Sequence, residues 1–184
     1  MNLKVRPERP PEFEQVQELH RLAFGGPSEA QVVANVRRAA GHLPDFSLVG
    51  ILDSPEGEVL AGHILFSHVG LEDDTGTVRR VLVLGPLAVH PDFQRRGVAG
   101  GLIRAGVQQA EARGEALIVV RGWDRIYGPF GFMPASAQGI VPPSDLPDRS
   151  YLARSLAAYT PDFRGTLRYP AAFQAVGYPV QWME

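Results

Sequence analysis

Hydrophobic positions near the N-terminus predict a short strand followed by two helices. Residues 3–6 have the pattern of a strand. The next apolar residues recur at spacings of three and four, which places them on one helical face: Phe13, Val16, Leu19 and Ala23. Gly25-Gly26 is expected to end this helix. Ser28 and Gln31 form a capping-box pattern, which predicts the start of a second helix that stops at Gly41.

The middle of the chain has the pattern of three strands. Residues 46–52 and 59–69 are expected to form a hairpin, because the turn residues of 54–57 separate them. A further apolar strand covers residues 78–89 and contains Gly85-Pro86. Proline donates no hydrogen bond to a strand ladder, so this pair predicts a bulge or a splayed edge.

A parallel strand unit follows. The loop 90–96 leads into a helix over 99–113, and 116–121 is a continuously apolar strand of the kind buried inside a sheet. The predicted buried face of this helix is Ala99, Leu102, Ile103, Gly106 and Ala110. Beyond residue 132 the pattern weakens, with one stretch at 151–158 that fits either a strand or a helix. Helices and strands together indicate an α/β (α+β) fold.

Composition narrows the class of protein. The chain has 184 residues, a net charge of −2 and no cysteine, which favours one domain over 1–184 and excludes disulfides and thiol catalysis. The charge gives no reason to expect a nucleic-acid partner. No apolar run is long enough to cross a membrane, and the N-terminus lacks the apolar core of a signal peptide. We therefore expect a cytoplasmic protein with no membrane partner.

Residues 94–100 are the main candidate for binding chemistry. They join a strand to the start of a helix, where unpaired backbone N–H groups and the helix dipole favour an anion. Gly97 lets an anion approach the backbone, and Arg95 and Arg96 add positive charge. Taken alone, the segment fits an ordinary loop equally well. A dinucleotide fingerprint is a poorer match because the glycines come late, and the Gly-Lys pair of a Walker loop is absent.

Several segments together resemble the GCN5-related N-acetyltransferases (GNAT family). Gln94-x-x-Gly97-x-Ala99 is similar to the acyl-CoA signature of that family, and 84–91 resembles the strand that precedes it. The segment 127–132, Tyr-Gly-Pro-Phe-Gly-Phe, resembles the family's Tyr-x-x-x-Gly-Phe segment. Residues 62–67 and 165–170 resemble the bacterial YhbS-like branch.

The resemblance implies a fold and a donor site. The fold would be a mixed, mostly antiparallel sheet with a central splayed pair of parallel strands, flanked by helices. Residues 1–132 would form the signature core, and 133–184 a C-terminal extension. The donor would be acetyl-CoA, with no metal. Its pantetheine arm would bond to the backbone of Leu87, Ala88 and Val89. Its pyrophosphate would lie on the loop residues Gln94, Arg95, Arg96, Gly97, Val98, Ala99 and Gly100.

Tyr127 matches the tyrosine that donates a proton to the leaving thiolate in this family. A phenol with a pKa near ~10 facing a thiol near ~8.5 makes full transfer uphill by roughly 2 kcal/mol. A hydrogen bond that strengthens late in the reaction is therefore as plausible as a complete transfer. The structural alternative is an aromatic ring that packs beside Phe130 and Phe132.

The base that receives the amine proton is less evident. A lysine-like amine lies ~3.4 units above pH 7, so its deprotonation costs about 4.6 kcal/mol. The strand 78–89 has no carboxylate that could do this directly. Glu29 and His63 are the two candidates. Glu29 is equally well explained as a charge at a helix N-terminus, and His63 as a structural histidine. His63 and His68 face opposite sides of a regular strand, so they form no metal pair.

The function expected is transfer of an acetyl group to a primary amine of a small molecule or peptide. The alternatives are a non-catalytic acyl-CoA-binding or sensing module, and a partner-binding domain that has lost both activities. Intact Gln94, Gly97 and Ala99 argue against the last. The segment 133–184 either closes the acceptor pocket or makes a homodimer contact, and composition does not decide between these.

Overall fold

The computed structural model describes residues 2–55, 57–143 and 150–174. Its strands are β1 (Leu3–Pro7), β2 (Ser47–Ser54), β3 (Gly57–Glu72), β4 (Val78–Val89), β5 (Leu117–Arg121), β6 (Met133–Pro134), β7 (Ile140–Val141), β8 (Tyr151–Ser155) and β9 (Gly165–Arg168). Its helices are α1 (Phe13–Phe24), α2 (Ser28–Arg38), α3 (Val98–Ala112), α4 (Asp124–Tyr127) and α5 (Ala171–Gln174). No helix in these described ranges is both long and apolar enough to span a membrane.

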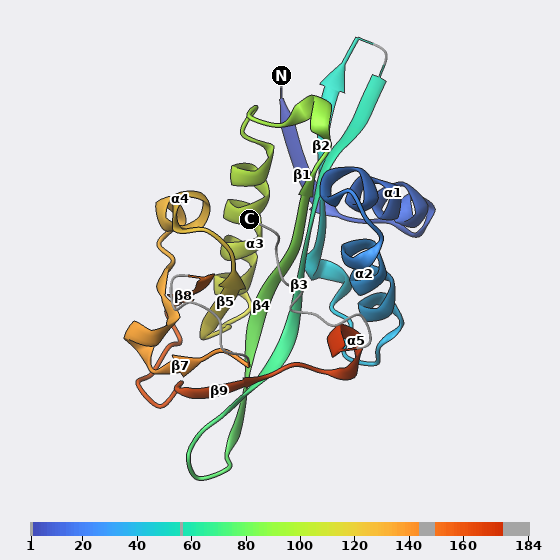
Figure 1. The fold of residues 1–184 in the computed structure, drawn as a ribbon. Helices are drawn as coiled ribbons and strands as arrows, with labels where there is room; N and C mark the ends of the chain where they lie inside the picture. The colour runs from blue at the N-terminus through green and yellow to red at the C-terminus, as the bar shows by residue number, and fades with distance from the viewer. Residues whose placement is uncertain (1, 56, 144–149, 175–184) are drawn as a thin grey trace.

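A single twisted sheet forms the centre of the molecule (Figure 1). Its main order is β1-β2-β3-β4-β5-β8-β6, with β9 paired to β3 and β7 paired to β9. Neighbouring strands run antiparallel except for two pairs, β4 with β5 and β7 with β9. The mixed, mostly antiparallel sheet with a central parallel pair was predicted, and the structure confirms it.

A bulge interrupts β4 directly after the segment that pairs with β5. Between Phe66 and Ile64 on β3, the partner strand advances from Leu84 to Leu87, so β4 uses one extra residue. The extra residue falls at Gly85-Pro86, where the sequence predicted a bulge. Among the described residues, the β4–β5 pairing ends at Leu84, one residue before the last pair that β5 could make, while β4 continues to Val89 with β3 as its one neighbouring strand. This end of β4 therefore has an edge without a strand partner.

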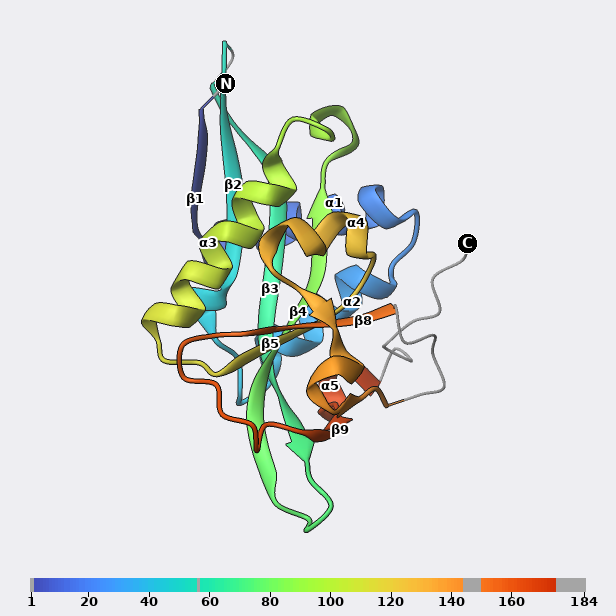
Figure 2. The same cartoon turned by 90° about the vertical axis from the view of Figure 1, so that its left-hand side faces the viewer.

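Helices cover both faces of the sheet (Figure 2). One apolar cluster lies between the sheet and the side chains of α1, α2 and α5, and includes Val16, Val33 and Val83. The other lies under α3 and α4, and includes Leu84, Leu102 and Tyr127. Because of the bulge, Ala88 joins the α1 side, whereas Leu87 and Val89 pack toward α3. Beyond the bulge, β4 thus presents Ala88 to one face of the sheet and Leu87 and Val89 to the other.

Two local predictions were wrong. Ser28 does not cap α2, because Pro27 occupies the N-cap and Ser28 is already helical; Gln31 instead donates to Asn35 within the helix at 2.9 Å. The first buried residue of α3 is Val98 and not Ala99, because this helix begins one residue earlier than predicted. The stretch at 151–158 that had two interpretations contains the strand β8.

Close approach of α3 to the sheet depends on glycine. A Cβ atom built at Gly106 would lie 2.2 Å from the ring of Phe66, which is completely buried on β3. We predict that Gly106→Val lowers the free energy of unfolding by about 1–3 kcal/mol, because the added methyl groups overpack this contact. Urea denaturation measures the change. Gln108→Ala, on the exposed side of the same helix, should stay within about 0.5 kcal/mol of the parent. Equal stability of the two variants would contradict the packing argument.

Candidate active site

The loop between β4 and α3 ends at an uncapped helix N-terminus. Gln94 fixes the loop to the preceding strand, since its Nε2 donates to the Val89 carbonyl at 3.4 Å. Arg95 and Gly97 both have positive φ angles, 60° and 82°. Gly97 is the N-cap of α3, and no side chain forms a capping hydrogen bond there. The first N–H groups of α3 therefore remain available to a ligand.

The exposed surface of this loop fits an anion. Gln94, Arg95, Arg96 and Gly97 are exposed, and nothing lies within 4 Å of a Cβ built at Gly97. The first turn of α3 contributes backbone groups at the positive end of the helix dipole. Val98 can contribute only its backbone, because its side chain is buried against the sheet. The loop thus has the donors and the open approach that a pyrophosphate needs.

Tyr127 lies close to the start of α3. A Cβ at Gly122 would lie 2.3 Å from the Tyr127 ring, so this glycine lets α4 fold back against the end of β5. The ring packs edge-to-face on Phe132 at 5.7 Å. Phe130, in the next turn, would lie 3.2 Å from a Cβ at Gly100. In Figure 2, α4 accordingly lies beside the N-terminal half of α3.

Burial makes the Tyr127 phenol a weaker acid. The side chain is 7% exposed, and removal from water raises its pKa above the ordinary tyrosine value. Full proton transfer to a thiolate therefore costs more than the roughly 2 kcal/mol of an ordinary phenol. The phenol remains able to donate a hydrogen bond in its neutral form. A role of Tyr127 in the reaction stays a prediction, and its packing on Phe132 agrees with the structural alternative as well.

Glu29 lies in the first turn of α2. Its side chain is buried, and desolvation raises the pKa of the carboxyl. Within the described ranges its carboxylate takes part in no ion pair. A buried carboxylate of this kind suits either a base or a contact to a cationic acceptor.

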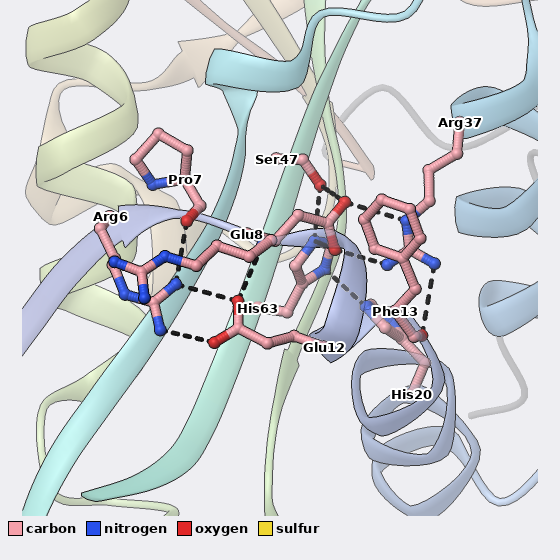
Figure 3. A network of polar contacts seen from close by, with 10 residues as sticks. Arg6, Pro7, Glu8, Glu12, Phe13, His20, Arg37, Ser47 and His63 are labelled. Atoms are coloured by element: carbon pink, nitrogen blue, oxygen red, sulfur yellow. Dashed lines mark hydrogen bonds and ion pairs between the residues drawn. The ribbon is translucent and has the colours of Figure 1, made fainter.

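His63 lies in a buried chain of polar side chains beneath α1 (Figure 3). Its Nδ1 is 2.8 Å from His20 Nε2, and its Nε2 is 2.9 Å from Ser47 Oγ. Ser47 Oγ donates to Glu8 at 2.5 Å. Arg37 completes the chain with two bonds to the Glu8 carboxylate, at 2.9 and 2.5 Å. Both ring nitrogens of His63 are therefore already engaged.

Burial keeps the two histidines of this chain neutral. His20 and His63 have no exposed surface. Burial, followed by the positive charge of Arg37, lowers the pKa of His20 to about 3. Burial also lowers the pKa of His63 well below the ordinary value, with further contributions from His20 and Arg37. The 3.8 Å approach of His63 to Glu8 is therefore a contact of a neutral imidazole and not an ion pair.

Sequence analysis selected only His63 from this chain of residues. Glu8, Ser47, His20 and Arg37 come from four other segments, and no short motif links them. One signal was present: His20 is four residues beyond Val16, which places a polar ring on the apolar stripe of α1. On β3, His63 is directly opposite Ala88 of β4. The polar chain thus lies next to the strand segment predicted to hold the donor.

Comparison with known proteins agrees with this geometry. Residues 4–135 match the acetyltransferase (GNAT) domain family. The chain belongs to the GNAT family of acetyltransferases. It is also 31% identical over 157 residues to the uncharacterized N-acetyltransferase YjhQ of Escherichia coli (strain K12), an alignment that covers 83% of this chain and 84% of YjhQ. The family and the enzyme class predicted from sequence are confirmed.

Two solved GNAT structures have the same fold. The N-acetyltransferase YhbS from Escherichia coli, in complex with CoA, superposes with a TM-score of 0.78 at 24% identity and covers 95% of this chain and 93% of its own. A GNAT acetyltransferase from Brucella melitensis, in complex with acetyl-CoA, gives 0.73 at 26% identity and covers 94% and 98%. The overall fold of this chain is therefore that of these two GNAT structures.

The buried neutral histidines predict a dependence of stability on pH. A depressed pKa in the folded state stabilises the fold above about pH 6.5, and this stabilisation is lost as the pH falls toward the folded value. Between about pH 7.5 and about pH 5, each such histidine should cost about 2 kcal/mol of unfolding free energy. Urea denaturation of the parent and His20→Gln measures the effect. The variant should lose about 2 kcal/mol less; an identical loss would show that His20 titrates normally.

Proposed function

We propose that this GNAT chain transfers the acetyl group of acetyl-CoA to a primary amine of a small molecule or peptide. The observation that carries the proposal is the combination of an uncapped α3 N-terminus with the unpaired edge of β4 beside it. One feature suits a pyrophosphate and the other an extended arm that adds to a strand edge. The relatives crystallised with CoA and acetyl-CoA support the same donor.

The donor would extend along the segment that the bulge exposes. Its pyrophosphate would bind the backbone of residues 95–100, with Arg95 and Arg96 at the rim. The pantetheine arm would bond to backbone groups of Leu87, Ala88 and Val89 that point away from β3. This arrangement brings the thioester to the same end of β4 as Tyr127.

The reaction proposed is direct attack of the amine on the thioester carbonyl. The amine nitrogen forms the new bond to carbon, and the carbon–sulfur bond breaks with its electron pair on sulfur. A backbone N–H of the segment 87–89 stabilises the oxyanion. Tyr127 donates a hydrogen bond to the developing thiolate, because its raised pKa disfavours complete proton transfer. Glu29, at the acceptor side, binds the cationic amine before it loses its proton.

A non-catalytic acyl-CoA-binding or sensing module is the second candidate. It is favoured by the absence of a carboxylate on β4, Val78–Val89. Binding needs only the loop and the strand edge, whereas transfer also needs a route for the amine proton. The two candidates therefore differ in turnover and not in affinity for CoA.

Release of free thiol from acetyl-CoA, measured with a panel of primary amines and peptides, tests the proposal. We expect turnover with at least one acceptor. Tyr127→Phe should slow that turnover about 10- to 100-fold, the effect of losing one hydrogen bond to a charged group. Its dissociation constant for CoA, measured by calorimetry, should stay unchanged, because the phenol acts on the leaving sulfur.

Tyr159→Phe is the matched control. Tyr159 is a half-buried tyrosine that packs on Phe163, and we place it in no catalytic role. It should leave the rate unchanged. Tight CoA binding without turnover for any acceptor would favour the sensing module. Turnover that Tyr127→Phe does not slow would remove this residue from the mechanism.

A further inference from the structure

The buried chain beneath α1 has a fixed direction. An ionised carboxylate only accepts hydrogen bonds, so the Ser47 hydroxyl must donate to Glu8. Ser47 Oγ then accepts from His63, which places the His63 proton on Nε2. The unprotonated Nδ1 of this neutral ring accepts from His20 Nε2. Glu8 and its partner Arg37 thus determine the tautomer of each imidazole in turn.

The last nitrogen of this chain is left with a lone pair. Neutral His20 donates through Nε2, so its Nδ1 carries no proton. This Nδ1 is buried, and no group of the described residues hydrogen-bonds to it. A buried acceptor without a donor costs free energy, typically about 1–3 kcal/mol. Such a group indicates a site for a ligand or a proton.

His20 lies on the α1 side of the sheet, as Ala88 of β4 does. Its ring contacts His63 at a centroid distance of 5.1 Å, and His63 is directly opposite Ala88 in the β3–β4 ladder. Ala88 and the apolar neighbours of α1 share one cluster on this face. His20 is also one helical turn before the end of α1, where partly buried Phe24 stacks on it at 6.0 Å. His20 therefore contacts the β3 residue that pairs with Ala88, and Ala88 belongs to the segment proposed to hold the thioester.

We propose that His20 is the general base that receives the proton of the acceptor amine, and that His63, Ser47 and Glu8 are the residues that position it. The proposal rests on the proposed acetyl transfer. It identifies the general base of that reaction, because β4 itself has no carboxylate that could serve as one. The proton arrives at Nδ1 across one water, because this buried nitrogen is out of direct reach of an acceptor amine. His63 is thus a positioning residue and not itself the base.

The chain also gives the proton a destination. As the amine proton binds His20 Nδ1, the Nε2 proton of His20 passes to His63 Nδ1. The Nε2 proton of His63 passes to Ser47 Oγ, and the Ser47 hydroxyl proton passes to Glu8. Each ring ends neutral in its other tautomer, and Glu8 becomes a carboxylic acid. No imidazolium accumulates, which agrees with the low basicity of both buried rings.

His20→Gln separates catalysis from structure. A glutamine amide reaches the position of Nε2, so it can still donate to His63, but it has no group in place of Nδ1. We expect kcat to fall about 100-fold or more, the usual contribution of a general base, with unchanged KM for acetyl-CoA. The matched variant Glu29→Gln tests the competing base. His68→Gln, a histidine on the other face that is paired with Glu115, should leave kcat unchanged.

A measurement independent of activity tests the chain itself. In the ¹⁵N NMR spectrum of histidine-labelled protein, His20 and His63 should both show an unprotonated Nδ1 and a protonated Nε2. The opposite tautomer at His20 would overturn the proposal. So would a full kcat for His20→Gln, with or without a loss of kcat in Glu29→Gln; in both cases acetyl transfer itself would stand. Absence of turnover in the parent protein would instead reject the proposed function, and the base with it.

Discussion

The separation of β4 from β5 beyond Leu84 is the constraint on which the rest of this site depends. The parallel pairing ends at Leu84, directly before the extra residue at Gly85-Pro86, and β5 ends at Arg121, so among the described residues the last part of β4 has one edge without a strand partner. The extra residue also reverses the alternation of side chains, so that Ala88 faces α1 while Leu87 and Val89 face α3. The bulge therefore lies next to the free edge proposed for the donor, and it decides which side chains of this segment face α1 and which face α3.

Sequence predicted those parts of the fold that depend on local patterns. The bulge followed from Gly85-Pro86, and the helix after Gly97 followed from its apolar spacing. Helix boundaries were less predictable, because a single residue decides them. Pro27 takes the N-cap position that Ser28 was expected to fill, and α3 starts at Val98. The catalytic roles assigned to Tyr127, Glu29 and His63 stay predictions, and the structure adds their burial.

The buried polar chain was not predictable in the same way. The five residues meet because the fold brings together the end of β1, the helices α1 and α2, and the strands β2 and β3: Glu8, His20, Arg37, Ser47 and His63. In the sequence, each of these residues has an ordinary explanation as a surface charge, a capping residue or a histidine of the core. Together they set the direction of every hydrogen bond from Glu8 to His20. In a water-excluded interior such a chain fixes tautomers more firmly than any exposed contact does.

A crystal structure with CoA bound tests the central claim most directly, because that claim concerns where the donor binds. The account predicts the pantetheine arm along Leu87–Val89 and the pyrophosphate on the backbone of residues 95–100. The molecule offers a second positively charged hollow, lined by Arg79, Arg80 and Arg113, at the opposite end of β4 and α3. A pyrophosphate bound there, with the β4 edge empty, would contradict the account.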